Sequence, residues 1–398
     1  MWIERQIAGE LSRLAGRFPI VVLIGPRQVG KTALVERLFG DFTYVSLDVP
    51  GHAEMAETRP DEFLRRYPPP AILDEVQYAP SFFRHLKAEV DRRGGNGLFV
   101  LTGSQNYLLM QSVSESLAGR AAVIPFLSLS GAEWAAAESL LEAHSWPEFL
   151  WRGGYPALWA GGESSPPRDR WYQGYVATYL ERDVRNLLAV GSLRDFERFL
   201  RACAARTAQT LNMAELGRDV GISATTAREW VSVLQASGQI VLLEPYHRSL
   251  GKRLVKSPKL YFADTGLAAF LMGFGSAEAL WSSTAAGALF ENYVVGQWVR
   301  WRDWSEPGAA LWYWRNQAGQ EVDLVIERNA RLTAVEVKLS QTPGPRDARA
   351  IERLRAFYGD GAVAGAYLAC TTEVPFDLTP GVTAVPGWTV WELEGGAA

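Results

Sequence analysis

The stretch Ile24–Thr32, IGPRQVGKT, follows the apolar run PIVVLI (19–24) and precedes KTALVERLF (31–39). Residues 25–32 fit the pattern G-x-x-x-x-G-K-[ST], which requires a strand before it and a helix after it. The preceding run is rich in β-branched residues, as buried parallel strands are, and the following segment has apolar residues at helical spacing. The stretch therefore predicts a phosphate-binding loop between a strand and a helix.

Each part of this loop has a chemical reason to face phosphate. Its glycines allow a tight turn, so that backbone N–H groups and the helix N-terminus point at phosphate oxygens. Lys31 brings a positive charge toward the β and γ phosphates of ATP, and the Thr32 hydroxyl is placed to bind Mg²⁺. The alternative is a glycine turn that only joins strand to helix. The predicted ATP-binding residues of the loop are Gly25, Pro26, Arg27, Gln28, Val29, Gly30, Lys31 and Thr32.

An acidic pair follows a second short apolar run, in PPPAILDEVQ (68–77). Hydrolysis at such a loop needs an acid for the metal ion and a group that orients the attacking water. We expect Asp74 to bind Mg²⁺ and Glu75 to act as the general base or to orient the water. The alternative is a solvated acidic pair at the end of a strand.

Two further segments are candidate sensors of the γ phosphate. In GLFVLTGSQN (97–106), a polar end follows an apolar strand, and Thr102, Ser104 or Gln105 could reach the phosphate or cap the next helix; we include Ser104 in the predicted ATP site. Arg120 could supply positive charge in cis, or across the interface of a homo-oligomer as arginine fingers do. A surface ion pair is the alternative for Arg120.

The pattern of these segments predicts the fold class. Short apolar runs alternate with helical stretches up to about residue 135, which is typical of an α/β protein with a doubly wound parallel sheet and a ligand at the carboxyl ends of its strands. A length of 398 residues predicts several domains. We expect a P-loop ATPase core at 1–135, a helical lid at 136–205, a winged-helix domain at 206–265 and a second α/β domain at 266–398.

The runs GPRQVGKTALV, LDEVQ and LTGSQ, followed by GR, resemble the AAA-type P-loop ATPases of bacteria and archaea that carry a C-terminal domain of unknown function 4143. The resemblance spans almost the whole chain. It continues through FLWRGGYPALW (149–159), YLERDV (179–184), PKLYFADTGL (258–267), GALFENYVV (287–295), and EVDLVIE followed by AVEVK. It implies ATP binding, a winged-helix segment and a restriction-endonuclease-like C-terminal fold.

The region after residue 211 predicts a DNA-binding module. Two short helical segments flank a tight turn, Ser223 is a suitable N-cap, and QIVLLEPYHRSLGKRLVKSPKLYFA (239–263) reads as a hairpin with a basic tip. Residues 194–259 contain 11 Lys or Arg and 6 Asp or Glu, a net charge of +5 in a chain of −4. This local charge predicts contact with duplex DNA, while docking of a protein partner is the alternative. The outward residues of the second helix would be Thr225, Thr226, Arg228 and Glu229.

The last third of the chain predicts a helix, three strands, a charged helix and a further strand, which is the core order of restriction-endonuclease-like folds. Residues two apart share a face of a strand, so Glu336 and Lys338 project together, and the neighbouring strand could bring Asp323 beside Glu336. Asp323 and Glu336 would hold Mg²⁺ or Mn²⁺, with Glu291 as a further ligand, and Lys338 would polarise water or the scissile phosphate. Packing alone can also give V-E-V-K in a half-exposed strand.

Composition excludes several classes of protein. Two cysteines and four histidines give no disulfide framework, zinc-thiolate site or histidine-rich metal centre. No apolar run approaches the roughly 20 residues of a membrane span, and the first segment reads as an amphipathic helix rather than a signal peptide. We expect a cytoplasmic protein with no membrane partner.

These observations favour an ATP-hydrolysing protein that couples its nucleotide state to DNA association, with phosphodiester cleavage by the C-terminal domain as an optional activity. The alternative hypothesis is that the protein is an ATP-dependent molecular switch that binds protein partners and has no nuclease activity.

Overall fold

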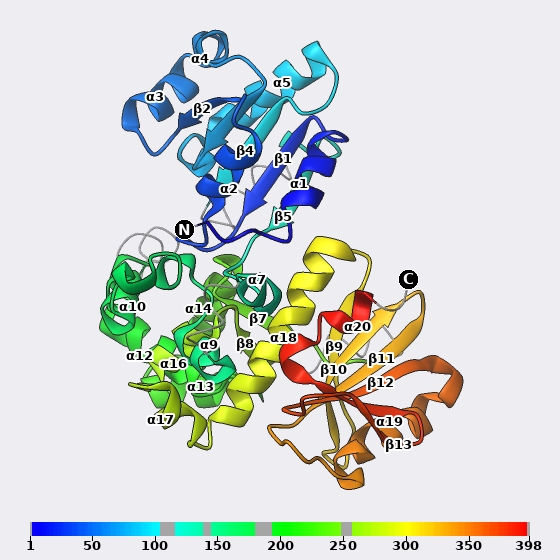
Figure 1. Ribbon diagram of the computed structural model, residues 1–398. Helices are drawn as coiled ribbons and strands as arrows, with labels where there is room; N and C mark the ends of the chain where they lie inside the picture. Colours follow the sequence, from blue (N-terminus) through cyan, green and yellow to red (C-terminus); the bar gives the residue numbers. More distant parts are fainter. Residues whose placement is uncertain (1, 104–115, 138–144, 180–192, 248–256, 396–398) are drawn as a thin grey trace. The chain divides into compact units, whose positions relative to one another are not determined.

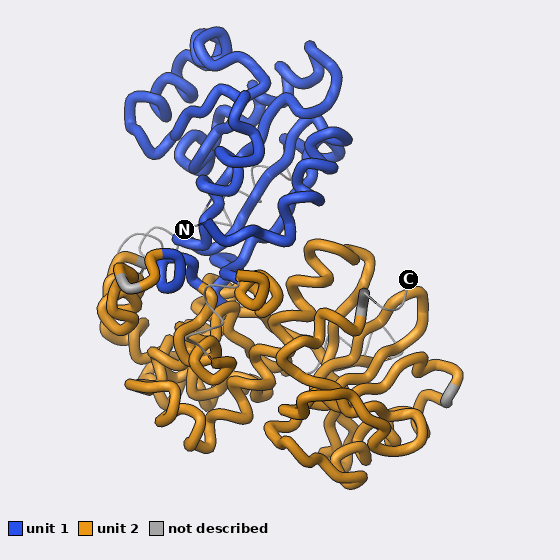
Figure 2. The backbone as a smooth tube through the Cα atoms, in the orientation of Figure 1, with its two compact units in different colours: residues 1–129, 155–160, 236–239 blue, residues 130–154, 161–235, 240–398 orange. Residues whose placement is uncertain are grey.

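The computed structural model describes residues 2–103, 116–137, 145–179, 193–247 and 257–395. Contacts within the chain divide it into two compact units (Figure 2). Unit 1 comprises residues 1–129, 155–160 and 236–239, and unit 2 comprises residues 130–154, 161–235 and 240–398.

Unit 1 is built on a parallel five-stranded sheet with the strand order β2-β3-β4-β1-β5 (Figure 1). Its strands are β1 (Ile20–Ile24), β2 (Thr43–Ser46), β3 (Ala71–Asp74), β4 (Phe99–Gly103) and β5 (Ala121–Pro125). Every residue of β1 is buried, because β4 and β5 pair with its two edges and its side chains pack into the core. The predicted α/β class with a parallel sheet is confirmed.

Helices connect these strands, as parallel pairing requires. Those that the structure describes in unit 1 are α1 (Ala8–Ala15), α2 (Lys31–Leu38), α3 (Pro50–Thr58), α4 (Pro60–Arg66) and α5 (Phe83–Arg93), with the 3₁₀ helices η1 (Val76–Tyr78), η2 (Pro80–Phe82) and η3 (Pro156–Leu158). Proline occupies the first turn of α3 and α4, where a missing N–H costs no helical hydrogen bond.

The first part of unit 2 is helical. The helices described there are α7 (Gly131–Ala136), α9 (Trp146–Arg152), η4 (Gly162–Ser164), α10 (Arg168–Tyr179), α12 (Leu193–Ala204), α13 (Met213–Val220), α14 (Ala224–Ala236), α16 (Thr265–Leu271) and α17 (Ala277–Trp281). The buried Trp134 packs on the half-buried Trp146, whose ring stacks on that of Trp388, from the C-terminal part of the unit, with centroids 5.6 Å apart.

A small antiparallel sheet with the order β6-β8-β7 accompanies α12, α13 and α14. Its strands are β6 (Gln209–Thr210), β7 (Ile240–Leu243) and β8 (Lys259–Phe262). The predicted strand pair of the hairpin is present as β7 and β8, while its basic tip lies outside the described residues. Trp230 of α14 packs against Phe196 and Phe199 of α12.

The C-terminal part of unit 2 contains a six-stranded mixed sheet with the order β13-β14-β12-β11-β10-β9. Its elements follow the predicted order of helix, three strands, helix and strand. They are α18 (Ala286–Ser305), β9 (Ala310–Arg315), β10 (Glu321–Arg328), β11 (Arg331–Val337), η6 (Pro345–Ala348), α19 (Arg349–Tyr358), η7 (Asp360–Ala362) and β12 (Val363–Cys370). The elements β13 (Phe376–Thr379), β14 (Val382–Pro386), η8 (Gly387–Thr389) and α20 (Glu392–Gly395) extend beyond that prediction.

Among the residues that the structure describes, no helix has both the length and the apolar character needed to cross a membrane.

Candidate functional site

The predicted phosphate loop lies between β1 and α2. Helix α2 begins at Lys31, directly after Gly30, whose φ of 92° is in the left-handed region. The Lys31 side chain is buried, and its ammonium donates hydrogen bonds to the Gly25 carbonyl at 2.9 Å and the Pro26 carbonyl at 2.8 Å. The lysine therefore folds back over the loop, with its charge held by loop carbonyls.

The two glycines of the loop are required for different reasons, Gly25 for space and Gly30 for its backbone conformation. A Cβ at Gly25 would lie only 1.9 Å from the carbonyl oxygen of Phe126, so the backbone passes too close for any side chain. This close approach is maintained by a hydrogen bond of 2.6 Å from the Phe126 N–H to the Ile24 carbonyl. Gly30 is needed for its conformation rather than for space.

Asp74 lies at the end of β3, where three hydroxyl groups donate to its carboxylate. Thr32 Oγ1 lies 3.1 Å from Oδ1, Tyr44 Oη lies 2.9 Å from Oδ2, and Thr102 Oγ1 contacts Oδ1. Burial, then the nearby Asp74 charge, raises the pKa of Tyr44, so this hydroxyl stays a donor. The structure thus brings Thr32 and Asp74 together, as a shared Mg²⁺ site requires.

Glu75 follows Asp74 in the left-handed conformation, with a φ of 56°. Its N–H donates to Thr102 Oγ1 at 3.3 Å, and its carboxylate accepts a hydrogen bond from the side chain of Gln77. Thr102 therefore joins both acidic residues, a role that differs from the phosphate sensor considered for it. Ser104 and Gln105 lie outside the described residues.

Arg5 holds the loop from the N-terminal segment, although no local pattern in the sequence indicates this contact. Its guanidinium donates to the Val29 carbonyl at 2.8 Å and the Leu127 carbonyl at 2.7 Å, and it lies 3.9 Å from the centre of the Phe126 ring. An arginine in an amphipathic segment predicts a solvated charge, so only the tertiary structure reveals this contact.

Arg120 lies at the opposite end of the sheet from the loop. Strand β5 runs parallel to β1, with Ala121 beside Ile20, so Arg120 precedes the strand whereas the loop follows Ile24. Five residues of strand separate the two ends by roughly 15 Å. Arg120 instead forms a surface ion pair with Asp91, with N–O distances of 2.6 and 3.0 Å. This placement contradicts the proposed action in cis; action in trans stays a prediction.

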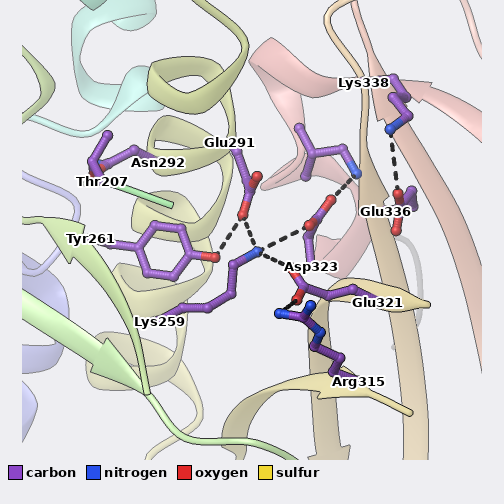
Figure 3. Close-up of polar contacts among 11 residues, drawn as sticks. Thr207, Lys259, Tyr261, Glu291, Asn292, Arg315, Glu321, Asp323, Glu336 and Lys338 are labelled. Atoms are coloured by element: carbon purple, nitrogen blue, oxygen red, sulfur yellow. Dashed lines mark hydrogen bonds and ion pairs between the residues drawn. The ribbon is translucent and has the colours of Figure 1, made fainter. Parts of the chain in front are cut away.

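The C-terminal carboxylates meet because of a tight turn. Asn329 and Ala330 both have positive φ, as a two-residue hairpin turn requires, and this turn pairs Leu324 with Val335. The next positions along are Asp323 on β10 and Glu336 on β11, which therefore lie side by side as predicted. Lys338 shares the face of Glu336, with 3.7 Å between Nζ and Oε1 (Figure 3).

A buried lysine stands where the sequence predicts a metal ion. Lys259 Nζ, from β8, lies 2.7 Å from Glu291 Oε1, 2.7 Å from Glu321 Oε1 and 3.2 Å from Asp323 Oδ1 (Figure 3). The other Asp323 oxygen accepts the Val337 N–H at 3.0 Å. With Lys259 in this position, no three carboxylate, histidine or cysteine side chains within the described ranges could hold a metal ion.

The structure does not present the predicted metal set Asp323, Glu336 and Glu291 as an open site, because two of its members, Asp323 and Glu291, contact an ammonium group. Sequence reasoning missed Lys259 and Glu321. Lys259 precedes Asp323 by 64 residues, and no local pattern connects them.

Burial controls the charges of this cluster. Burial, then the Asp323 charge, raises the pKa of Glu336 well above its usual range, and its buried Oε2 has no hydrogen-bond partner among the described residues. The same two causes raise the pKa of Glu291 to about 7. Burial lowers the pKa of Lys259, but Tyr261 and the surrounding carboxylates more than offset this and raise it, so Lys259 is charged.

Family models cover most of the chain. A model of an AAA domain matches residues 17–135, one of a domain of unknown function (DUF8612) matches 143–278, and one of a domain of unknown function (DUF4143) matches 286–390. The first range contains the phosphate loop, Asp74 and Glu75, and the last contains Glu291, Asp323 and Glu336.

Similar proteins include uncharacterized proteins of Mycobacterium tuberculosis and Mycobacterium bovis. Each is 32% identical over 393 residues, which cover 97% of this chain and 84% of the relative. A solved structure, the Walker-type ATPase of Pyrococcus abyssi, has 14% identity and a TM-score of 0.45, covering 68% of this chain and 96% of that chain. The matched domains and the near full-length relatives place this chain in the family of AAA-type P-loop ATPases that carry a C-terminal DUF4143 domain.

Proposed function

We propose that this ATPase couples its nucleotide state to association with duplex DNA, which it contacts through residues 193–262. The observation that carries the DNA part of the proposal is the net charge of +5 over residues 194–259, the region that contains α13 and α14, in an otherwise acidic chain.

At the ATP site, Lys31 is the group that must move. Its ammonium now bonds to the carbonyls of Gly25 and Pro26, and phosphate oxygens of ATP would replace those carbonyls as its partners. The backbone N–H groups of the loop and the first turn of α2 would bind the phosphates. Binding therefore exchanges two neutral acceptors for a charged one, which strengthens the hydrogen bonds of the lysine.

Thr32 and Asp74 are the residues that would hold Mg²⁺. The ion would neutralise charge that develops on the phosphates. Tyr44 and Thr102 donate to the Asp74 carboxylate and so fix its orientation. Glu75 would accept the proton of the attacking water, with Gln77 and Thr102 holding its position.

The helix-turn-helix segment supports the DNA proposal. The order α12, β6, α13, α14, β7, β8 is that expected of a winged helix, in which α14 would be the recognition helix. Ser223 caps α14 by accepting the Thr226 N–H at 3.0 Å, and Thr225, Arg228 and Glu229 are exposed. These side chains are free of the core and available to a duplex.

Phosphodiester cleavage is not part of the proposed function. The predicted catalytic residues Glu336 and Lys338 lie beside each other, but the Lys259 ammonium is placed among the carboxylates that would have to bind the catalytic metal. The alternative hypothesis is that a protein partner binds the same exposed helix. The following experiment distinguishes protein binding from DNA binding.

The test is steady-state ATP hydrolysis with and without duplex DNA at low salt, with Lys31→Ala as the blank. We expect stimulation of several-fold that falls as salt rises, because phosphate contacts release counterions. Arg228→Ala should weaken the stimulation, whereas Arg353→Ala, an exposed arginine of α19, should not. Turnover that is indifferent to DNA would overturn the proposal and favour a protein partner.

A further inference from the structure

We propose that Lys259 is a built-in substitute for the divalent cation of the C-terminal carboxylate cluster, so that this domain binds no Mg²⁺ or Mn²⁺ while β8 is in place. The inference concerns unit 2 alone and does not depend on the proposed coupling of ATP to DNA.

The cluster has the composition of a site for a hard cation. Glu291, Glu321 and Asp323 each direct one carboxylate oxygen at a single point, and oxygen donors of this kind are those that Mg²⁺ and Mn²⁺ prefer. The Lys259 Nζ atom occupies that point at 2.7–3.2 Å from all three oxygens. Ammonium and metal ion would therefore compete for the same ligands in the same space.

The lysine has two advantages in this competition. It is covalently attached, so it is present at the cluster at a high effective concentration that no dissolved ion shares. It also uses its three donors on three different carboxylates, which satisfies the valence of an ammonium group in a site where its side chain is only 2% exposed.

The strand that carries Lys259 is itself fixed in place. Asn292, the residue after Glu291 on α18, donates to the Phe262 carbonyl and accepts the Phe262 N–H, both at 2.7 Å. Tyr261, two residues after Lys259, donates to Glu291 Oε1 at 2.7 Å. Helix α18 therefore holds the last two residues of β8, so the strand presents Lys259 to the carboxylates from a fixed position.

Several carboxylate oxygens that do not face Lys259 also have partners within the protein. The second oxygen of Asp323 accepts the Val337 N–H, and Arg315 lies 3.8 Å from the second oxygen of Glu321. Among the described residues, Glu336 forms an ion pair with Lys338, at 3.7 Å, rather than with Lys259. Protein cations therefore accompany the cluster, with the buried Lys259 among three carboxylates and the more exposed Arg315 and Lys338 beside Glu321 and Glu336.

Mn²⁺ titration of the full-length, nucleotide-free chain tests the proposal. All proteins carry Asp74→Asn, which removes the predicted metal ligand of the ATP site. With Lys259 intact, we expect no Mn²⁺ binding that depends on Asp323: the parent and its Asp323→Asn variant should give the same isotherm. Adding Lys259→Met should create one Mn²⁺ site per chain, at least tenfold tighter than any in the parent, and a further Asp323→Asn change should abolish it.

Arg315→Met is the matched control. It also removes a positive charge beside Glu321, but it leaves the Lys259 position filled, so it should create no site. An Asp323-dependent Mn²⁺ site in the parent would overturn the proposal, and this comparison needs no change at Lys259. A folded Lys259→Met protein that gains no site would also overturn it. If that variant folds only with Mn²⁺ present, the metal is replacing the lysine, as proposed.

Discussion

At Gly25, a single hydrogen atom decides whether the phosphate loop can form. Replacing it with a methyl group would put carbon 1.9 Å from the Phe126 oxygen, and both partners are backbone, so neither can move without distorting β1 or β5. We predict that Gly25→Ala lowers the free energy of unfolding by about 1–3 kcal/mol, the usual cost of overpacking, and weakens ATP binding. Urea unfolding and nucleotide titration would measure the two effects.

Gly51→Ala is the control for this change. Gly51 lies in α3 and a Cβ there would have nothing within 4 Å, so alanine should be neutral or stabilise the chain by up to about 1 kcal/mol. Equal destabilisation by both variants would contradict the explanation based on close approach.

Thr102 supports a second prediction at this scale. Its hydroxyl contacts Asp74 and accepts the Glu75 N–H, so Thr102→Val removes the link between both acidic residues while keeping the shape of the side chain. We expect kcat for ATP hydrolysis to fall by about 10–100-fold, as is typical when the support of a metal ligand is lost, with little change in KM. An unchanged kcat would show that the acidic residues do not need this hydroxyl.

The sequence predicts residues of the ATP site when they belong to one local pattern. Gly25–Thr32 and the Asp74–Glu75 pair sit where their spacing places them. Arg5 and Tyr44 could not be predicted, because they reach the site from other segments and carry no pattern of their own. For Arg120, the sequence is compatible with action in cis, action in trans or a surface ion pair. The direction of β5 argues against action in cis.

At the scale of elements, Lys259 joins three of them: its strand β8, helix α18 through Glu291, and strand β10 through Glu321 and Asp323. Removing one partner from a buried charged cluster leaves the other charges uncompensated. We predict that Lys259→Met lowers the free energy of unfolding by about 3–5 kcal/mol in metal-free buffer. Chemical unfolding followed by tryptophan fluorescence measures this.

Arg315→Met should change the same quantity by less than about 1 kcal/mol, because its contact with Glu321 is half exposed and long. Comparable losses in the two variants would mean that Lys259 has no special place in the cluster.

The order of elements was largely predictable, because continuous apolar runs mark β1, β3 and β4, and apolar residues with period 2 or 3.6 mark β10, β11 and the helices. The contact between Lys259 of β8 and the C-terminal carboxylates could not be predicted from the sequence. Strand pairing and helix contacts depend on distant partners, so periodicity places Lys259 in a strand and says nothing of the three carboxylates that it meets.

At the scale of the whole molecule, the two parts of the proposed activity belong to different units. The ATP site lies in unit 1, whereas α14 and the carboxylate cluster lie in unit 2. The chain passes between the units at five places, near residues 129, 154, 160, 235 and 239. Coupling between nucleotide and DNA is therefore a property of the full chain, and it has to be measured there.

The most direct test of that coupling is the affinity for a fluorescently labelled duplex, measured by anisotropy at constant salt with ADP and with a non-hydrolysable ATP analogue. Coupling free energies of 1–3 kcal/mol are usual, so we predict dissociation constants that differ by about fivefold or more between the two nucleotides. Lys31→Ala should abolish the difference. Identical dissociation constants with both nucleotides, in a wild-type chain shown to bind each of them, would contradict the account.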